Sequence, residues 1–267
     1  MSVLADIARL SRRIQAILDQ ALGDIDTAGD TFSDDVTHAI LRLLDDFDLD
    51  ALAALDLDAV IEEALAEAFD DLDDELRTVT SARLKELIDE TDAFYKQRGI
   101  EAPGAAEAVR RSQEAHAISQ VFDASMNVRR EKLQEEATEA LTEAIAAGGI
   151  NRTALAERVA ERADVSMGLA RTQVDTSLSA YNQAYRNQLA EDAGLGHFLY
   201  YGSITDRSRV FCRERADKVY TSEQIDAMDN GQINPVRIFR GGFNCRHSLL
   251  AIDIAWSKEL ADKLVDT

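Results

Sequence analysis

Long stretches of this chain place apolar residues three and four positions apart, and only two prolines interrupt them. The stretches Leu4–Leu18, Leu57–Leu87 and Ile118–Ile145 all follow this spacing. Spacing of this kind gives an α-helix one apolar face. The sequence therefore predicts a mainly α fold. A turn-rich segment, Asp24–Ser33, is expected to end the first helix, and a second helix is expected to start after it.

Turn and cap signals divide the chain further. Pro103 follows the first helical region, and Gly148-Gly149 is expected to end the helix that contains Ile145. Asn151 is expected to cap a short helix through Ala163, and Ser166 another that runs to about Asp192. Three segments follow from these signals: an acidic helical region 1–102, a long helix plus helical pair 103–195, and a small module 196–267.

After Gly196 the pattern changes from long helices to short elements. Short apolar runs bounded by turn residues favour strands. Three strands are expected, at His197–Tyr201, Lys218–Tyr220 and Ser248–Ile252, with helical segments at Val210–Arg215, Ser222–Asp229 and Ala255–Leu264. The predicted architecture is a long-helix N-terminal body followed by a small α+β C-terminal module.

Charge is spread unevenly along the 267 residues, whose net charge is −21. Residues 1–100 carry 25 acidic and 9 basic side chains, whereas residues 196–267 carry 10 of each. The N-terminal part should therefore repel nucleic acid, while the C-terminal part tolerates it. With 30 Asp and only 6 Lys, the composition suits either a high-salt environment or a high-GC genome. The sequence contains no apolar run of about 18 residues, so no membrane contact is expected.

The scarce reactive side chains gather near the C-terminus. Both cysteines, Cys212 and Cys245, lie there, and His247 follows the second one. Residues two apart on an extended chain point to the same side, so Cys245 and His247 can bind one metal. Cys212 and Asp206 would complete a four-ligand zinc site. A packed thiol pair, a disulfide and a nucleophilic Cys/His pair are the alternatives.

Glycines and arginines surround these residues. Gly241-Gly242 indicates a turn that delivers a strand. Asp206 at the start of a short helix is expected to cap it, and Arg209 to form a fork with carboxylates or backbone carbonyls. Arg240 and Arg246 flank the glycine turn and are expected to join a salt-bridge network or bind an anion.

The segment from about Leu169 to Ile252 resembles the phage Mu F-like, or phage head morphogenesis, family of minor head proteins. The resemblance rests on short motifs in a fixed order. They are Ala170-Arg171-Thr172-Gln173, Ala180-Tyr181-Asn182, Tyr201-Gly202-Ser203, Asp206-Arg207-Ser208-Arg209 with Cys212, Val219-Tyr220, and Gly241-Gly242-Phe243-Asn244-Cys245-Arg246-His247. The chain departs from the family pattern at Gln173, at Ser208 and at His247, where the family often has a second cysteine.

The resemblance implies a non-enzymatic minor capsid protein of a tailed virus, made in the host cytoplasm and placed in the virion near the portal vertex. Implied partners are the portal protein, the major capsid or other head proteins, packaged DNA through the C-terminal module, and further copies of the chain through the long helices. The alternative is a metal-binding enzyme or toxin-like module with a Cys/Cys/His site. Structural or docking roles fall on Arg171, Asp206, Arg209, Cys212, Gly241, Gly242, Asn244, Cys245, Arg246 and His247.

Overall fold

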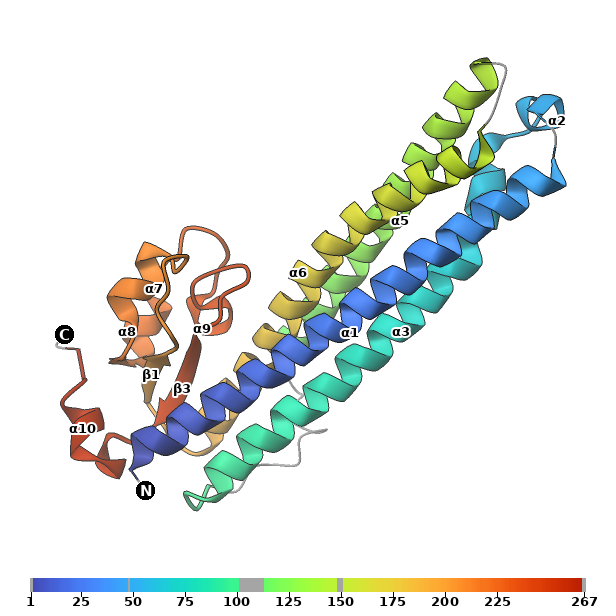
Figure 1. Cartoon of the computed structure of the whole chain (residues 1–267). Helices are drawn as coiled ribbons and strands as arrows, with labels where there is room; N and C mark the ends of the chain where they lie inside the picture. The colour runs from blue at the N-terminus through green and yellow to red at the C-terminus, as the bar shows by residue number, and fades with distance from the viewer. Residues whose placement is uncertain (1, 48, 101–112, 148–150, 266–267) are drawn as a thin grey trace. The chain divides into compact units, whose positions relative to one another are not determined.

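The computed structural model describes residues 2–47, 49–100, 113–147 and 151–265. Within these residues, five helices precede a small sheet and several short helices (Figure 1). They are α1 (Val3–Asp46), α2 (Leu49–Ala53), α3 (Leu57–Lys96), α5 (Gln113–Ala146) and α6 (Arg152–Asp192). The predicted fold class, a long helical body followed by a small α+β module, is confirmed. None of the described helices is both long and apolar enough to cross a membrane.

The chain forms two compact units. The first comprises residues 1–21, 81–120 and 174–267, and the second comprises residues 22–80 and 121–173. Both units are therefore assembled from segments that lie far apart in the sequence. Of the predicted segment boundaries, the one at Pro103 lies outside the described residues, and the one at residue 196 falls between the end of α6 and the first strand.

The second unit packs parts of four helices around an apolar core. The rings of Phe32 and Phe69 lie 5.2 Å apart at its centre. Each fully buried aliphatic or aromatic side chain contributes about 1.5–3 kcal/mol. The other large buried apolar side chains come from α1, α3, α5 and α6, and they include Ile25, Val36, Ile40, Leu43, Ile61, Leu65, Leu72, Leu76, Leu133, Leu141, Leu155 and Val159.

Helix α1 runs without interruption through Asp24–Ser33, so the predicted break there is wrong. The apolar spacing continues across it, because Ile25, Ala28 and Phe32 are all buried. The polar residues between them do not compete with the helix. The hydroxyls of Thr27 and Thr31 donate to carbonyls four residues earlier, which leaves the backbone helical.

Helix α6 is likewise continuous, so the predicted division after Ala163 is also wrong. The predicted start is confirmed, since Oδ1 of Asn151 accepts a hydrogen bond from the backbone N–H of Ala154 at 3.2 Å. Ala163, Val174 and Leu178 are all buried, so the helix has apolar anchors on both sides of the expected break. Tertiary packing therefore outweighs the local cap signal at Ser166.

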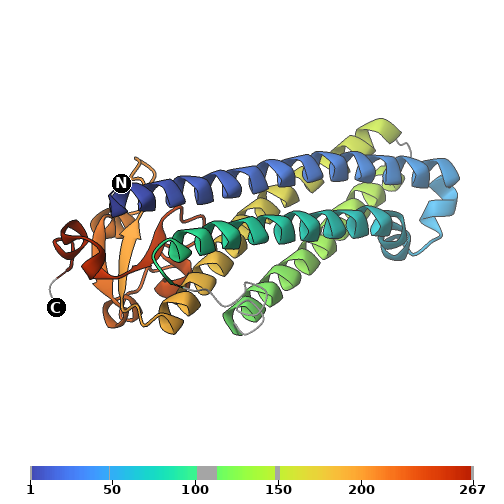
Figure 2. The same cartoon turned by 90° about the horizontal axis from the view of Figure 1, so that it is seen from below.

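The C-terminal module contains a three-stranded antiparallel sheet in the order β2-β1-β3. Its strands are β1 (His197–Tyr201), β2 (Lys218–Thr221) and β3 (Ser248–Ile252), which confirms all three predicted strands. Helix α7 (Val210–Arg215) also matches its prediction. Figures 1 and 2 both draw the sheet together with the short helices α7, α8 and α9. Three consecutive residues of β1 are buried, as expected for a strand that is covered on both faces.

Three further short elements complete the module. Helix α8 (Ser222–Asp226) is shorter than predicted, and α9 (Val236–Phe239), which follows Pro235, was not anticipated. The predicted helix Ala255–Leu264 is instead the 3-10 turn η1 (Ile254–Trp256) and the short α10 (Lys258–Ala261). Ser257 separates these two elements, because its extended backbone and its hydroxyl cap the start of α10.

Side chains from the long helices of the first unit hold the sheet. Gln183 of α6 donates to the carbonyl of Leu249 at 2.8 Å and accepts from its N–H at 3.1 Å. This amide therefore takes the place of a neighbouring strand at the edge formed by β3. Tyr95 of α3 donates to the carbonyl of Ala251 at 3.0 Å. These bonds fix the end of the chain segment that delivers the candidate site.

Candidate functional site

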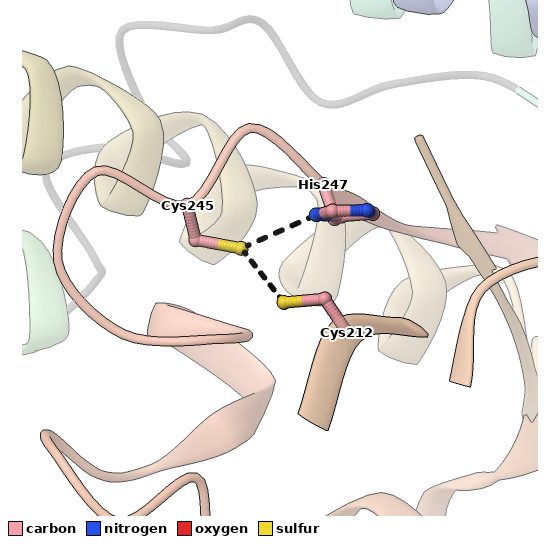
Figure 3. Close-up of side chains that lie close together, drawn as sticks. All are labelled: Cys212, Cys245 and His247. Atoms are coloured by element: carbon pink, nitrogen blue, oxygen red, sulfur yellow. Dashed lines mark hydrogen bonds between the residues drawn. The ribbon is translucent and has the colours of Figure 1, made fainter. Parts of the chain in front are cut away.

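Cys212, Cys245 and His247 form one buried cluster (Figure 3). The two sulfurs are 4.0 Å apart, and the Cys245 sulfur is 3.8 Å from Nδ1 of His247. The three possible ligand atoms lie within 4.8 Å of one another. The side chains are only 2%, 5% and 6% exposed, and both thiols are free. The structure thus brings together three of the four predicted metal ligands.

Three chain segments converge to build this cluster. Cys212 comes from α7, Cys245 from the turn after α9, and His247 from the residue before β3. The turn between α9 and β3 has left-handed backbone at Arg240, Gly242 and Asn244, with φ values of 49°, 95° and 53°. This conformation favours glycine at position 242, as the sequence indicated. The turn lets Cys245 and His247 face Cys212 together.

Gly241 is required for a different reason from Gly242. A Cβ atom at this position would lie 2.3 Å from the Cys212 sulfur and 3.1 Å from the Cys245 sulfur. Its backbone N–H also donates to the Cys245 sulfur at 3.2 Å. Glycine is therefore required here for space beside the two thiols rather than for its backbone conformation. On the other side of the cluster, a Cβ at Gly202 would lie 2.7 Å from the His247 ring.

Arg209 forms the predicted fork with backbone carbonyls. Its Nη1 donates to the carbonyl of Gly241 at 3.0 Å, and its Nη2 donates to that of Phe243 at 2.7 Å. These charge-assisted bonds join the start of α7 to the glycine turn, more than thirty residues later. Arg209 therefore fastens together the two segments that carry the cysteines.

Replacing Arg209 with alanine is expected to lower the free energy of unfolding by about 2–3 kcal/mol, because two hydrogen bonds to a charged group are lost. Arg209→Lys should recover part of this loss, since an ammonium group cannot form the same fork. Urea denaturation of both variants measures the effect. Arg207→Ala is the matched control, because Arg207 is exposed and has no bonding partner within the described ranges. Equal losses for Arg207→Ala and Arg209→Ala would contradict the role of the fork.

Asp206 lies outside the cluster, and its predicted capping role is wrong. Its side chain is exposed, and the N-cap residue of α7 is Arg209, which makes no side-chain cap. Asp206 lies inside a turn closed by Thr205 and Ser208, and this turn precedes the helix. The backbone carbonyl of Asp206 accepts from Arg213 at 2.6 Å, so this residue shapes the loop through its main chain.

The remaining predicted docking residues form their polar contacts outside the cluster. In the first unit, Arg246 pairs with Asp19 at 2.5 Å, and the backbone N–H of Asn244 donates to the hydroxyl of Thr176 at 3.5 Å. In the second unit, Arg171 contacts both carboxylate oxygens of Asp26, at 2.8 and 2.9 Å. Exposed ion pairs of this kind contribute at most about 1 kcal/mol each.

Tyr200 belongs to the site, although its sequence context indicated only a strand residue. Its hydroxyl donates to the Cys212 sulfur at 3.3 Å and lies 3.9 Å from the Cys245 sulfur. Burial raises the pKa of Tyr200, and the neighbouring Cys245 sulfur raises it further, so the phenol stays protonated as a donor. An aromatic residue in a buried strand gives no sequence signal for such a contact.

Arg240 is buried beneath the glycine turn. It donates to the carbonyls of Ser179 and Ile238, at 2.9 and 2.6 Å. It has no carboxylate partner among the described residues, so the predicted salt-bridge network does not extend to it. Its positive charge instead helps to lower the pKa of Cys245.

A hydrogen bond couples the two thiols and shifts their pKa values in opposite directions. The pKa of Cys245 is lowered, first by its hydrogen bond with Cys212 and then by His247 and the charge of Arg240. The pKa of Cys212 is raised by the same bond and by burial. Cys245 is therefore the sulfur that loses its proton first, and Cys212 donates to it. A thiolate beside a thiol and an imidazole is suited to a soft metal ion.

An open pocket of about 780 Å³ in the first unit reaches the cluster. Cys212, Cys245 and His247 all line it. The described residues around it include four arginines and no carboxylate, and the arginines are Arg12, Arg207, Arg209 and Arg246. The lining is therefore basic, although Asp19 outside it neutralises Arg246 and the chain as a whole is strongly acidic. Comparison of the chain with protein-family models, with curated proteins and with solved structures finds no match.

Proposed function

We propose that this chain is a minor capsid protein of a tailed virus that acts by attachment rather than by turnover. One observation carries the proposal: several of the motif residues that resemble Mu F-like proteins converge on a single buried cluster. The cluster itself comprises Cys212, Cys245 and His247. Three glycines leave space for the segments around it or let them turn, and they are Gly202, Gly241 and Gly242. Arg209 joins these segments by hydrogen bonds. Residues scattered over about 45 positions thus act as one structural unit.

The charge distribution supports different roles for the N-terminal helices and the C-terminal module. Residues 1–100 carry 25 acidic side chains and 9 basic ones, which disfavours contact with packaged DNA. The arginine-lined pocket, to which both α1 and the module contribute, favours contact with anionic groups. On this proposal the long helices contact portal, shell or further copies of this chain. The module docks at the portal vertex, where DNA lies within reach.

Co-purification with the portal protein tests the proposal. The full-length chain is expected to capture the portal protein from a lysate that contains the head proteins. Reversing two exposed pocket charges, Arg12→Glu with Arg207→Glu, should lower the captured amount by about tenfold, because each unfavourable charge at an interface costs of the order of 1 kcal/mol or more. The matched control is Lys218→Glu, an exposed lysine of β2 that does not line the pocket. Failure of the unmodified chain to capture the portal protein counts against the proposal.

A metal-dependent enzyme is the second candidate, and the open pocket favours it. Three metal-binding side chains that line a pocket leave a fourth position free for water or substrate, which is the arrangement of catalytic zinc sites. Arginines around such a position suit a phosphate-containing substrate. Zinc-dependent hydrolysis of a simple phosphodiester, abolished by Cys245→Ser, would favour this candidate over attachment.

A further inference from the structure

We propose that Cys212, Cys245 and His247 bind one zinc ion, with the fourth coordination position open to the arginine-lined pocket. The site does not depend on the attachment proposal, because it follows from the geometry of these three side chains alone. They come from α7, from the turn after α9 and from the residue before β3. A bound ion would therefore join three segments of the module at one point.

The distances suit tetrahedral zinc. With Zn–S bonds of about 2.3 Å and Zn–N bonds of about 2.0 Å, neighbouring ligand atoms lie roughly 3.5–3.8 Å apart. Here the sulfurs are 4.0 Å apart, and one sulfur is 3.8 Å from Nδ1 of His247. All three ligand atoms lie within 4.8 Å of one another. The S–S and S–N separations are within about 0.3 Å of the zinc values.

A disulfide fits the same site less well. Its S–S bond of about 2.05 Å requires the two sulfurs to approach by about 2 Å. Gly241 leaves the space that two separate sulfurs occupy, since a Cβ there would lie 2.3 Å from one sulfur and 3.1 Å from the other. A disulfide also gives no purpose to the imidazole of His247, whose Nδ1 faces the Cys245 sulfur.

Donors around the two sulfurs resemble the outer shell of a zinc site. The hydroxyl of Tyr200 points its proton at Cys212, and the backbone N–H of Gly241 points at Cys245. Such bonds orient metal-bound thiolates and stabilise their charge. Two thiolates and a neutral imidazole balance the charge of Zn²⁺, so the ion enters this buried site without adding net charge. Any proton still on either sulfur leaves to solvent on binding.

The fourth ligand would come from the pocket. The three side chains form part of its lining, and the four arginines of the same lining favour a negative ligand. Among the described residues, no further histidine, cysteine or carboxylate joins the cluster. Water, hydroxide or a small inorganic anion is therefore the chemical class expected at this position.

Metal analysis of the full-length protein tests the site. Protein loaded with zinc and then dialysed is expected to retain about one zinc ion per chain. Cys245→Ser and His247→Gln should each lower zinc affinity by at least about tenfold. His38→Gln is the matched control, because His38 is exposed and lies in the other unit. Cobalt(II) in place of zinc should give the intense visible bands and thiolate charge-transfer band of a tetrahedral sulfur site.

Thiol labelling of the unmodified protein keeps the test independent of variant folding. Zinc should protect both cysteines from alkylation under native conditions, and a chelator should expose them. Retention of less than about a tenth of one zinc per chain would overturn the proposal. The proposal would also be overturned if the protein, purified with zinc present and without a reducing agent, had the mass of a chain that contains a disulfide. Loss of portal capture with zinc binding intact would count against the attachment proposal alone.

Discussion

Replacing Gly241 with alanine is expected to lower the free energy of unfolding by about 3 kcal/mol and to open the cysteine cluster. The added Cβ would lie 2.3 Å from the Cys212 sulfur, a distance that no relaxed structure tolerates. Overpacking of a closed site costs about 1–3 kcal/mol, and the cost is at the upper end where neighbours cannot move away. The Cys212 sulfur has to shift to relieve this contact, and the shift is expected to change its distance from Cys245.

Two measurements separate these effects. Urea denaturation gives the loss of stability, and zinc retention reports whether the sulfurs still meet. Gly196→Ala is the matched control, because a Cβ at that position meets nothing within 4 Å. Its stability should match that of the unmodified protein or exceed it slightly, since alanine restricts the unfolded chain.

A double variant identifies the clash itself. Cys212→Ala removes the sulfur that the new Cβ would meet, so Gly241→Ala should cost less in that background than in the unmodified protein. The difference is the coupling energy of the two positions, expected to be about 1–2 kcal/mol. A Gly241→Ala protein that equals the unmodified chain in both stability and zinc retention would contradict the steric role of this glycine.

The C-terminal module could be predicted closely from the sequence because its signals are local. Short apolar runs between turn residues gave the bounds of β1, β3 and α7. The approach of Cys245 and His247 also follows from local geometry, since side chains two apart on an extended segment share a side. Both results rest on interactions within a few residues.

What the sequence did not show depends on contacts between distant segments. In the sequence, Tyr200 is indistinguishable from other aromatic residues of strands. Only the fold shows that α7 places Cys212 against its hydroxyl. Asp206 is a residue type that often caps helices, but it lies in a turn that precedes α7, whose N-cap residue is Arg209. The purpose of Gly241 was assigned to backbone conformation, whereas its neighbours show that space beside the sulfurs is what matters. Each of these differences requires the tertiary structure.

The helix breaks were wrong for the same reason. In Asp24–Ser33 the composition of Asp, Thr and Gly favours a turn, because these residues have low helix propensity. Propensity differences are below about 1 kcal/mol per residue, whereas each buried apolar side chain contributes about 1.5–3 kcal/mol. Ile25 and Phe32 are buried within the second unit, and Ala28 lies between them. Packing of these side chains therefore decides the conformation of the segment.

The variant Asp30→Pro tests whether the segment Asp24–Ser33 is a helix or a turn. Asp30 is exposed and lies inside α1, so Asp30→Pro removes a helical hydrogen bond and adds a clash with the preceding turn while leaving the core side chains unchanged. The expected loss in free energy of unfolding is about 3 kcal/mol or more, seen in urea titrations followed by far-ultraviolet circular dichroism. Asp30→Ala, the matched control, should be neutral or slightly stabilising, because alanine has the highest helix propensity. If Asp24–Ser33 were a turn, Asp30→Pro would unfold at the same urea concentration as the unmodified protein, since turns accept proline readily.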